Sequence, residues 1–422
     1  MTVTRLGVAD ASRHMLAGVE PLPGEEVTLE RALGRVLARD VVSTITLPPW
    51  NNASMDGFAL RGADVAGASA ERPVRLRVVE TIAAGRRGTR DVGPGEATRI
   101  MTGAPVPPGA DSVVRVEDTD GGADPGTVMV RDDRDAGRNV RARGEDIRAD
   151  SVVLTAGTAI AAAHVGVLSS VGCAAPFVHR RPRVAVLATG DELVPLERFA
   201  EVQAGERIVS SNSYSLAAAV EAAGGEPVPL GIAPDDPGAL AHCLRRADGC
   251  DMVLTSGGVS VGDFDYTRAV VGTLGGELSL WRVRMRPGAP LGFGRLFSVP
   301  WLGLPGNPVS ALVTFELFAR PLLRVLAGHR CPHRPTVQVV LGQNVELAAP
   351  LTHYLRAVFA VEEDGRLVAT LTGAQSSGML TSMALADGLL VLPGDRASYA
   401  AGTLASAVML DGDLKGSVRF PG

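Results

Sequence analysis

Three glycine-rich segments of the chain have residue types suited to binding anionic oxygen. They are TGDEL at 189–193, SGGVSVGDFDY at 256–266 and PGNPVSA at 305–311, and each directly follows a short apolar run. Glycine lets a backbone approach a ligand closely, and free amide N–H groups beside hydroxyl groups suit phosphate oxygens. The candidate ligand-binding residues in these segments are Thr189, Gly190, Ser256, Gly257, Gly258, Ser260, Gly306 and Asn307.

Any one of these segments alone is more often a tight connection between elements than a binding loop. Three of them at strand ends of one sheet reverse that preference, because such ends meet at one edge of a parallel sheet. No segment has the GxxxxGK[ST] pattern of a phosphate loop or the GxGxxG pattern of a dinucleotide site. The sequence therefore predicts a phosphate-binding crevice without indicating ordinary nucleotide hydrolysis or hydride transfer.

Acidic residues accompany these segments. Glu192 lies in TGDEL, Asp235 opens DDPGAL, and Asp263 and Asp265 lie in the second segment. Carboxylates beside a phosphate repel it unless a cation lies between them, and Mg²⁺ prefers carboxylate and phosphate oxygens. We therefore expect Mg²⁺ among these acids. The alternative for Asp235 is an ordinary helix N-cap, and Asp191 is expected to brace its loop.

A turn near the N-terminus, PPWNNASMDGFAL at 48–60, displays Asp56 among Trp50, Met55 and Phe58. A solvated turn does not need these apolar side chains. A functional carboxylate held in a fixed position does need rigid support around it. The turn is therefore a second candidate site.

Two further segments carry candidate residues. RIMTGAPVPPGADSVVRVEDT at 99–119 contains Thr102, whose hydroxyl could contact a substrate, and GRNVRARGEDI at 137–147 places Arg141 near Asp146. A charge run of this kind is more often a solvated hinge or a surface ion pair. Arginine beside acids can also recognise oxyanions with two hydrogen bonds.

The elements that position these residues indicate a multidomain α/β protein. Apolar strands alternating with helices over 180–328 predict an open, mostly parallel α/β sheet. Short alternating strands with dense Gly, Pro and Asp predict a β-rich inserted domain at 48–147, and renewed alternation predicts a β-barrel-like domain at 329–422. The remaining residues, 1–47 and 148–179, are expected to form an N-terminal helical linker domain.

Two expectations concern this linker domain. The apolar periodicity of its N-terminal part, which includes Leu29, Leu33 and Leu37, predicts two helices. Residues 151–178 contain no charged side chain and are long enough to cross a bilayer. Because this run is mostly Ala, Gly, Ser and Thr, we expect a strand followed by a buried helix rather than a membrane span.

Composition is that of a soluble globular protein. The chain has 422 residues, 46% of them hydrophobic and 21% charged, which predicts two to four domains. A net charge of -5 gives no general attraction for nucleic acid. The first residues lack the apolar core of a signal peptide. The four cysteines, whose spacing fits neither a zinc site nor a disulfide framework and favours a reducing cytoplasm, are Cys173, Cys243, Cys250 and Cys331.

Several ordered segments together resemble the molybdopterin molybdenumtransferase family, which includes the bacterial MoeA proteins and the C-terminal domain of gephyrin. The segments are PPxxxxxMDGFA, MTGAPVPPGADSVVRVEDT, RxRGEDI, ATGDELV, SNSYSLAAAVEAAG, SGGVSVGDFDYT, RPGAPLGFG, LPGNPVSALVTFELF and QSSGMLTSMA, and they cover essentially the whole chain. Molybdopterin adenylyltransferases share only the central α/β part, so the turn at Asp56 and the final β domain separate the two families.

The resemblance implies a MogA-like, molybdopterin-binding central domain and a transferase activity. Such an enzyme inserts molybdate into adenylylated molybdopterin and releases AMP in a Mg²⁺-dependent reaction. The implied ligands of the metal and pyrophosphate are Glu192, Asp235 and Asp265; the functional positions outside the α/β domain are Asp56, Thr102, Arg141 and Asp146; the other substrate contacts are Arg286, Pro305, Pro308 and Ser377.

The resemblance also implies partners. It suggests a cytoplasmic homodimer whose clefts combine the α/β domain of one subunit with the Met-Asp-Gly turn of the other, and molybdopterin adenylyltransferase as the upstream partner. A carboxylate that reaches across a subunit boundary explains the apolar support around Asp56.

Two positions depart from the family pattern. The turn has Asn51-Asn52-Ala53-Ser54 where relatives usually have an Asp-Asn pair before Ser-Ala, and the RPGAP segment has Arg286 and Ala289 where many relatives have lysine. Arginine can still bind an oxyanion, but alanine cannot. The departures leave two alternatives open, a non-catalytic molybdopterin-binding scaffold and a tungstate-preferring paralogue. A nucleotide pyrophosphatase using the α/β site alone is a more distant third.

Overall fold

The computed structural model describes residues 6–124, 126–258 and 264–410, excluding the side chains of Phe264, Asp265, Tyr266, Arg268, Leu280 and Trp281. The chain divides into two compact units by its own contacts. The first contains the residues through Arg39, Gly157–Ala161 and the residues from Ala175 onward; the second contains Asp40–Ala156 and Ala162–Ala174. The four-domain boundaries predicted from the sequence stay a prediction.

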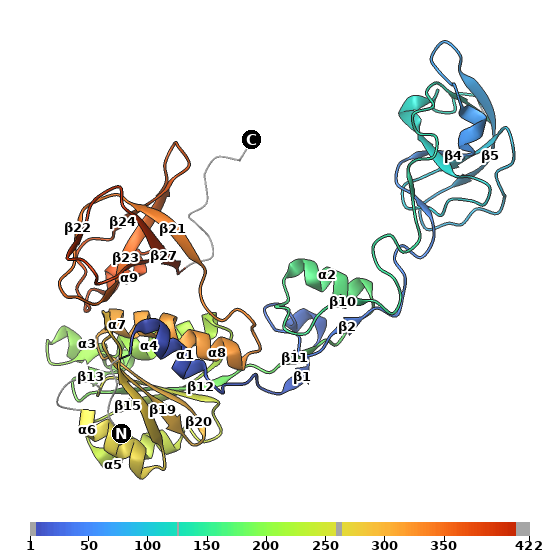
Figure 1. Cartoon of the computed structure of the whole chain (residues 1–422). Coiled ribbons are helices and arrows are strands. Elements are labelled where there is room, and N and C mark those ends of the chain that lie inside the picture. The colour runs from blue at the N-terminus through green and yellow to red at the C-terminus, as the bar shows by residue number, and fades with distance from the viewer. Residues whose placement is uncertain (1–5, 125, 259–263, 411–422) are drawn as a thin grey trace. The chain divides into compact units, whose positions relative to one another are not determined.

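A six-stranded sheet is the centre of the first unit (Figure 1). Its strands, in spatial order, are β15 (Glu226–Ala233), β12 (Arg183–Thr189), β16 (Met252–Ser256), β20 (Val299–Leu304), β19 (Pro290–Leu296) and β17 (Glu277–Arg282). The first four are parallel, and β19 and β17 are antiparallel to their neighbours. The prediction of an open, mostly parallel sheet is confirmed.

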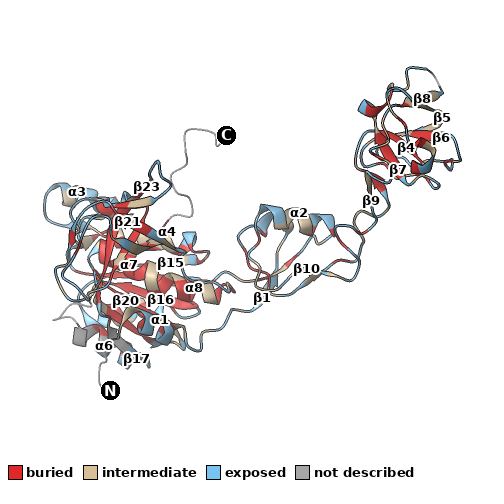
Figure 2. Ribbon diagram, turned by 45° about the horizontal axis from the view of Figure 1, so that its top comes forward, coloured by how far each residue is buried: buried red, intermediate tan, exposed pale blue. Residues whose placement is uncertain are grey.

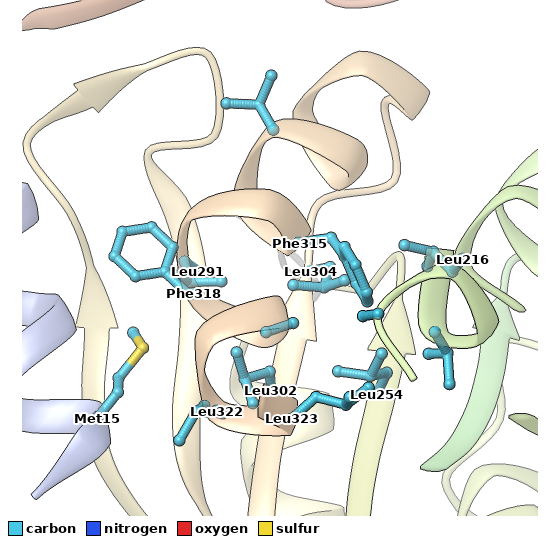
Figure 3. Packing of buried hydrophobic residues seen from close by; sticks show 14 of the residues in the cluster. Met15, Leu216, Leu254, Leu291, Leu302, Leu304, Phe315, Phe318, Leu322 and Leu323 are labelled. Carbon is cyan, nitrogen blue, oxygen red and sulfur yellow. The ribbon is translucent and has the colours of Figure 1, made fainter. Parts of the chain in front are cut away.

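Helices cover both faces of this sheet. They are α1 (Val8–Leu16), α4 (Ser211–Ala222), α5 (Pro237–Arg245), α6 (Phe264–Thr273), α7 (Pro308–Thr314), a π-helical turn at Phe315–Ala319, and α8 (Arg320–Leu326). A further short helix, α3 (Phe199–Gln203), lies between β12 and α4 along the chain. One apolar cluster, which includes Met15, Leu216 and Phe315 (Figure 3), joins α1, α4, α7 and α8 to the sheet, and a second cluster joins α5 and α6 to the other face. Burial of these side chains is the main stabilising term of the unit.

The C-terminal part of the first unit is a closed barrel. Strands β23 (Thr352–Val361), β24 (Leu367–Leu371), β21 (Thr336–Leu341), β27 (Leu404–Met409) and β25 (Gly388–Leu392) pair in this order, and β25 pairs back to β23. The predicted barrel-like domain is confirmed. Strand β18 (Met285–Arg286) adds to the start of β23, β22 (Val345–Glu346) pairs with β26 (Ser398–Tyr399), and α9 (Leu380–Ala384) precedes β25.

The N-terminal segment contains one α-helix in the described residues, α1, and it packs against the central sheet. The prediction of a second helix in this segment is wrong, because only a 3-10 turn at Leu29–Arg31 forms. Beyond it Gly34 has a φ of 76°, and Val36 and Leu37 form bridges to Ala159 and Val178. Backbone pairing therefore overrides the helical periodicity of the leucines. Nearby, β1 (Gly24–Glu26) pairs with β11 (Phe177–His179).

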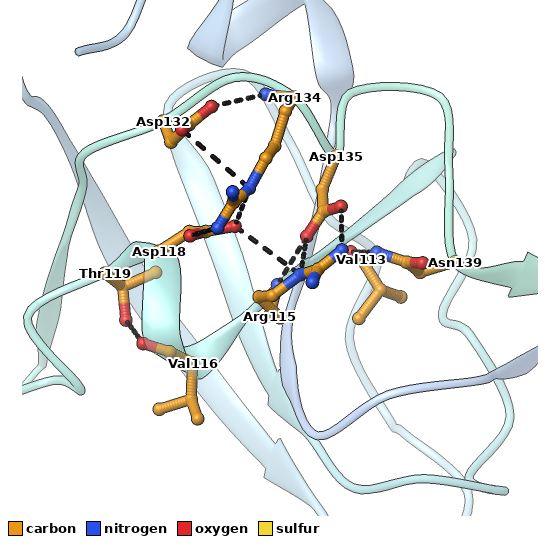
Figure 4. A network of polar contacts seen from close by, with 9 residues as sticks. All are labelled: Val113, Arg115, Val116, Asp118, Thr119, Asp132, Arg134, Asp135 and Asn139. Atoms are coloured by element: carbon orange, nitrogen blue, oxygen red, sulfur yellow. Dashed lines mark hydrogen bonds and ion pairs between the residues drawn. The ribbon is translucent and has the colours of Figure 1, made fainter.

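The second unit contains the β-rich inserted domain, so the prediction of this domain is confirmed. Its five-stranded sheet has the order β7 (Ser112–Arg115), β4 (Gly57–Leu60), β6 (Glu96–Ile100), β5 (Val74–Ile82) and β8 (Thr127–Val130), with 3-10 turns at Gly62–Val65 and Val116–Asp118. Buried residues concentrate in these strands as they do in the central sheet (Figure 2). Beside the sheet, Arg115 forms two hydrogen bonds of 2.9 Å to Asp135, and Arg134 pairs with Asp118, which fixes the loop before β9 (Val140–Arg141) (Figure 4).

Residues 151–178 form a short strand and a helix, as expected. Strand β10 (Val152–Leu154) pairs with β2 (Val41–Val42), and α2 spans Ala162–Ser170. The prediction that this helix is buried is wrong, since Leu168 is its one buried residue. No helix among the described residues is long and apolar enough to cross a membrane.

Candidate functional site

The predicted glycine-rich segments meet at one cavity of about 670 Å³, here called the glycine-loop cavity. It lies in the first unit, at the carboxyl ends of β12, β16 and β20, where ligands of parallel α/β sheets bind. Its lining includes the predicted residues Thr189, Gly190, Glu192, Asp235, Ser256, Gly257, Gly258, Pro305, Gly306, Asn307 and Pro308. Ser260 lies outside the described residues.

Glycine is required where two of these segments meet. Gly257 has a φ of 95°, and a Cβ atom there would lie 2.5 Å from the carbonyl oxygen of Thr189. At Gly190 the φ is 148°, a backbone conformation that residues with a side chain rarely adopt. The loops can approach each other this closely only without side chains.

Asn212, in the first turn of α4, also lines the cavity, and sequence reasoning did not select it. Its Nδ2 donates to Ser256 Oγ at 2.6 Å and to the carbonyl oxygen of Gly306 at 2.8 Å. These bonds tie two glycine loops together and fix the orientation of the amide. The sequence signal that could have identified it is the polar SNS segment at the start of α4, because polar side chains at a helix start can contact a ligand.

Two buried polar atoms of this cavity have no hydrogen-bond partner among the described residues. They are Oδ1 of Asn212 and Oγ1 of Thr189. A buried polar atom without a partner costs about 1–3 kcal/mol, so native structures rarely leave one unless a ligand or water satisfies it. The cavity is therefore built to receive a polar ligand.

The acids have separate roles. The N–H of Asp235 donates to Asp191 Oδ1 at 3.1 Å, so Asp191 braces its loop as predicted. The N-cap of α5 is Asp236, whose side chain accepts from the N–H of Ala239 at 2.8 Å, so the N-cap alternative for Asp235 is wrong. Both Glu192 and Asp235 line the cavity.

The donor set partly fits Mg²⁺. Two carboxylates and the Thr189 hydroxyl face one cavity, and oxygen ligands of this kind suit the ion when a substrate phosphate completes the site. The third predicted ligand, Asp265, is the second residue of α6, and its side chain lies outside the described part. No group of three or more candidate ligands occurs among the residues that were described.

A second cavity of about 710 Å³, here called the arginine cavity, adjoins the first. It lies between the β18 loop, the start of α7 and the barrel. Both cavities are lined by Pro290, Asn307 and Ser310. The predicted residues Arg286 and Ser377 lie here, together with Ala289, Glu346, His353 and Arg356.

Arg356 is fully buried, which sequence reasoning did not anticipate. Its guanidinium donates to Ser382 Oγ at 3.0 Å and to the carbonyl oxygens of Gln375 and Ser376 at 3.2 and 3.0 Å. No described carboxylate forms an ion pair with it, and burial lowers the pKa of Arg356. An uncompensated buried cation makes this cavity favourable for an anion. The signal in the sequence was a lone arginine inside the apolar strand THYLRAVFAV.

The loop that Arg356 holds also contacts α7. The carbonyl oxygen of Ser377 accepts a hydrogen bond of 3.1 Å from the N–H of Val309. On the opposite wall, β18 places Arg286 in register with His353 of β23. The arginine cavity is therefore built from the α/β sheet and the barrel together.

The second unit brings Asp56 and Thr102 together. Both the backbone N–H and Oγ1 of Thr102 donate to Asp56 Oδ1 at 2.7 Å. Arg141 lies in β9 opposite Asn52, and the N–H of Asp146 donates to the carbonyl oxygen of Leu47 at 3.2 Å. The Thr102 hydroxyl thus serves the carboxylate, and the roles predicted for these four residues stay predictions.

Family models match most of the chain. The MoeA N-terminal region (domain I and II) matches residues 6–172, a probable molybdopterin binding domain matches 185–325, and the MoeA C-terminal region (domain IV) matches 338–410. These three models confirm the resemblance that the motifs indicated.

Curated relatives match over most of their length. Molybdopterin molybdenumtransferase 2 of Mycobacterium tuberculosis (strain ATCC 25618 / H37Rv) is 40% identical over 383 residues, which cover 89% of this chain and 93% of the relative. Molybdopterin molybdenumtransferase of Bacillus subtilis (strain 168) is 35% identical over 410 residues, covering 96% of this chain and 94% of the relative.

Solved structures agree. Crystal structures of the molybdopterin biosynthesis MoeA protein from Pyrococcus horikoshii match with TM-scores of 0.82 and 0.76 at 27% and 31% identity, covering 96% and 97% of this chain and 100% of each solved chain. Sequence motifs, the matched family models and the shared architecture agree over nearly all of the chain, which is therefore a member of the MoeA family of molybdopterin molybdenumtransferases.

Proposed function

We propose that this protein is a transferase of molybdenum cofactor biosynthesis, which inserts molybdate into adenylylated molybdopterin and releases AMP in a Mg²⁺-dependent reaction. One observation carries the proposal: a cavity with glycine loops and acids adjoins a cavity with two arginines, and both are lined by Asn307 and Ser310. A reaction that joins a phosphorylated pterin to an oxyanion needs such neighbouring sites.

The glycine-loop cavity is assigned to the pterin and its pyrophosphate. The backbone N–H of Gly258 can donate to a phosphate oxygen, because no side chain blocks its approach. The N–H groups of Gly190 and Gly257 donate to the carbonyl oxygens of Ala233 and Leu304, so these two glycines only make room for the ligand. The unpartnered Oγ1 of Thr189 can donate to an oxygen, and Oδ1 of Asn212 can accept from a ring N–H. Together these groups orient the substrate.

Glu192 and Asp235 are the described residues that would hold Mg²⁺ in this cavity. When bound, the ion neutralises charge on the pyrophosphate and makes AMP a better leaving group. Without a cation, the two carboxylates would repel the phosphates.

The arginine cavity is assigned to molybdate. Arg286 and Arg356 provide positive charge, while Ser310 and Ser377 provide hydroxyl groups of the kind that contact oxyanions. Pro290, Asn307 and Ser310 separate this cavity from the pterin side, so the oxyanion is held beside the atoms that receive the metal.

The proposal includes the assembly that the sequence suggested. The protein is a cytoplasmic homodimer and receives its substrate from molybdopterin adenylyltransferase. In this dimer Asp56, which is exposed and held by two hydrogen bonds, acts in the site of the partner subunit. Support comes from its position on a turn where Trp50 and Phe58 are packed and Met55 is exposed.

The test is an assay of AMP release from adenylylated molybdopterin with purified full-length protein. Release should require Mg²⁺ and should be much faster with molybdate than without an oxyanion. Pterin binding without release at saturating molybdate would instead identify a scaffold. Faster release with tungstate than with molybdate would identify the tungstate-preferring alternative.

A further inference from the structure

His353 is a buried histidine in the wall of the arginine cavity, only 3% exposed. Its Nδ1 lies 2.8 Å from the carbonyl oxygen of Leu351. A carbonyl oxygen accepts only, so Nδ1 must carry the hydrogen. In the neutral imidazole, Nε2 is then left with a lone pair and no hydrogen.

The Nε2 atom is buried and has no hydrogen-bond partner among the described residues. Because a buried nitrogen without a hydrogen bond costs free energy, we infer that a ligand or a water molecule supplies its partner. Of the described cavities, the arginine cavity is the one that His353 lines. An unsatisfied nitrogen therefore accompanies the residues assigned to the oxyanion.

The charged groups around the imidazole favour coupling between binding of the anion and uptake of a proton. Arg286 is in register with His353 on the paired strand β18, Arg356 lies three residues along the same strand β23, and Glu346 of β22 is the carboxylate that lines the cavity. A bound dianion favours the imidazolium, because the ring then has an opposite charge beside it.

We propose that His353 binds the oxyanion as the imidazolium and takes up one proton from solvent as the anion enters. Its Nδ1–H remains on the carbonyl oxygen of Leu351, and the newly formed Nε2–H donates to an oxygen of the anion. Release of the anion returns the proton to solvent. The inference rests on the proposed function, since it takes the arginine cavity as the oxyanion site.

The assignment also fits the lining of the cavity. Ala289, between Arg286 and the start of β19, lines the same cavity and carries no charge. His353 supplies a positive charge there only while an anion is bound. The cavity thus holds a dianion without a permanent third cation.

The test is calorimetric titration of the full-length protein with sodium molybdate between about pH 6.5 and pH 8.5, where free molybdate is a dianion. Two buffers with different ionisation enthalpies report the proton uptake at each pH. We expect uptake approaching one proton and an affinity that falls by up to about tenfold per pH unit. Uptake near zero throughout would overturn the proposal.

Two substitutions divide the roles of the two nitrogens. His353→Asn retains a donor near the position of Nδ1 and removes Nε2, so it should weaken molybdate binding by about tenfold to a hundredfold at the lower pH. His353→Gln places an amide donor near the position of Nε2 that cannot titrate, so binding should remain and the pH dependence should disappear. His333→Asn, an exposed histidine outside the cavity, should bind like the wild type.

The outcomes separate this inference from the proposed function. Unchanged pH dependence in both His353 variants would overturn the role of the histidine while leaving molybdate-dependent AMP release intact. Absence of that release in the wild type would overturn the function itself. If His353→Asn fails to fold, the His353→Gln titration still decides the question.

Discussion

The carboxylate of Asp56 accepts both available hydrogen bonds of Thr102, from the backbone N–H and from Oγ1, each 2.7 Å long. The backbone bond is the larger cause, and the hydroxyl the next, of a pKa of Asp56 below its ordinary value. Thr102 follows β6 and Asp56 precedes β4, and these strands pair. The sheet itself therefore holds an exposed carboxylate ionised and in one orientation.

Thr102→Val should raise the pKa of Asp56 toward its ordinary value, because it removes the hydroxyl donor while the backbone donor remains. A carboxylate that is harder to ionise should also move the acid side of the activity profile to higher pH. Carbon-13 NMR titration of the Asp56 carboxyl measures the shift, with Thr102→Ser as the control that retains a donor. An identical pKa in the valine variant would show that the hydroxyl does not stabilise the ionised form.

Neighbouring aspartates provide a matched test of the Mg²⁺ site. Asp235→Asn should raise the Mg²⁺ concentration needed for AMP release by about tenfold or more, since it removes one of the two described carboxylates of the cavity. Asp236→Ala should leave that concentration unchanged but destabilise the protein by about 0.5–2 kcal/mol, because it removes the N-cap bond to Ala239. Metal titration and thermal unfolding of both variants measure the two effects, and the same Mg²⁺ dependence in both would remove Asp235 from the site.

Arg356 should be irreplaceable by lysine. Its fork reaches carbonyl oxygens of Gln375 and Ser376 and the hydroxyl of Ser382, an arrangement that a single ammonium group cannot reproduce. Arg356→Lys should lower stability by about 1–3 kcal/mol and weaken molybdate binding at least about tenfold. Calorimetry and urea unfolding measure both, with the exposed Arg366→Lys on the adjacent strand region as control. Wild-type binding in Arg356→Lys would show that the loop geometry does not depend on the fork.

His329 should make the free energy of unfolding fall as the pH falls below neutral. Burial, and then the positive charges of Arg324 and Arg320, lower the pKa of His329 to about 4, and its Nδ1 lies 3.0 Å from Nη2 of Arg324. An unfolded histidine binds a proton near pH 6.5, so the unfolded state gains protons first as the pH falls. The contribution of His329 is thus present above about pH 6.5 and is lost progressively toward pH 4.

The comparison is with His329→Gln, whose amide oxygen can still accept from Arg324. Between about pH 7 and pH 5 the wild type should lose about 1–2 kcal/mol more stability than this variant, a figure reduced for partial exposure. Urea unfolding at both pH values measures the difference. His333→Gln is the exposed control, and equal acid sensitivity of wild type and His329→Gln would contradict the prediction.

The glycine-rich part of the site could be predicted because it follows from strand order. Thr189 and Ser256 end parallel strands and Pro305 directly follows one, so their loops meet whatever the detailed packing. Arg356 and His353 could not be selected in this way. The alternation of their segment predicts a strand, but it does not show that a barrel wall closes a cavity against α7.

Local sequence patterns gave wrong predictions where pairing between distant segments determines the structure. The leucines around Leu33 have a helical spacing, yet Val36 and Leu37 are taken by backbone bridges. The sequence offered Asp235 as an alternative N-cap, whereas the structure shows that the next residue, Asp236, caps α5. Adjacent positions therefore differ in role for reasons that composition does not contain.

The closure of β25 onto β23 has a consequence for how this protein can associate. A ring of strands offers no continuous unpaired margin along which a foreign polypeptide could extend the sheet. Whatever docks on this part of the molecule must recognise side chains and loops, so substitutions on the outer surface of the ring can alter recognition without opening a route to fibrous self-association.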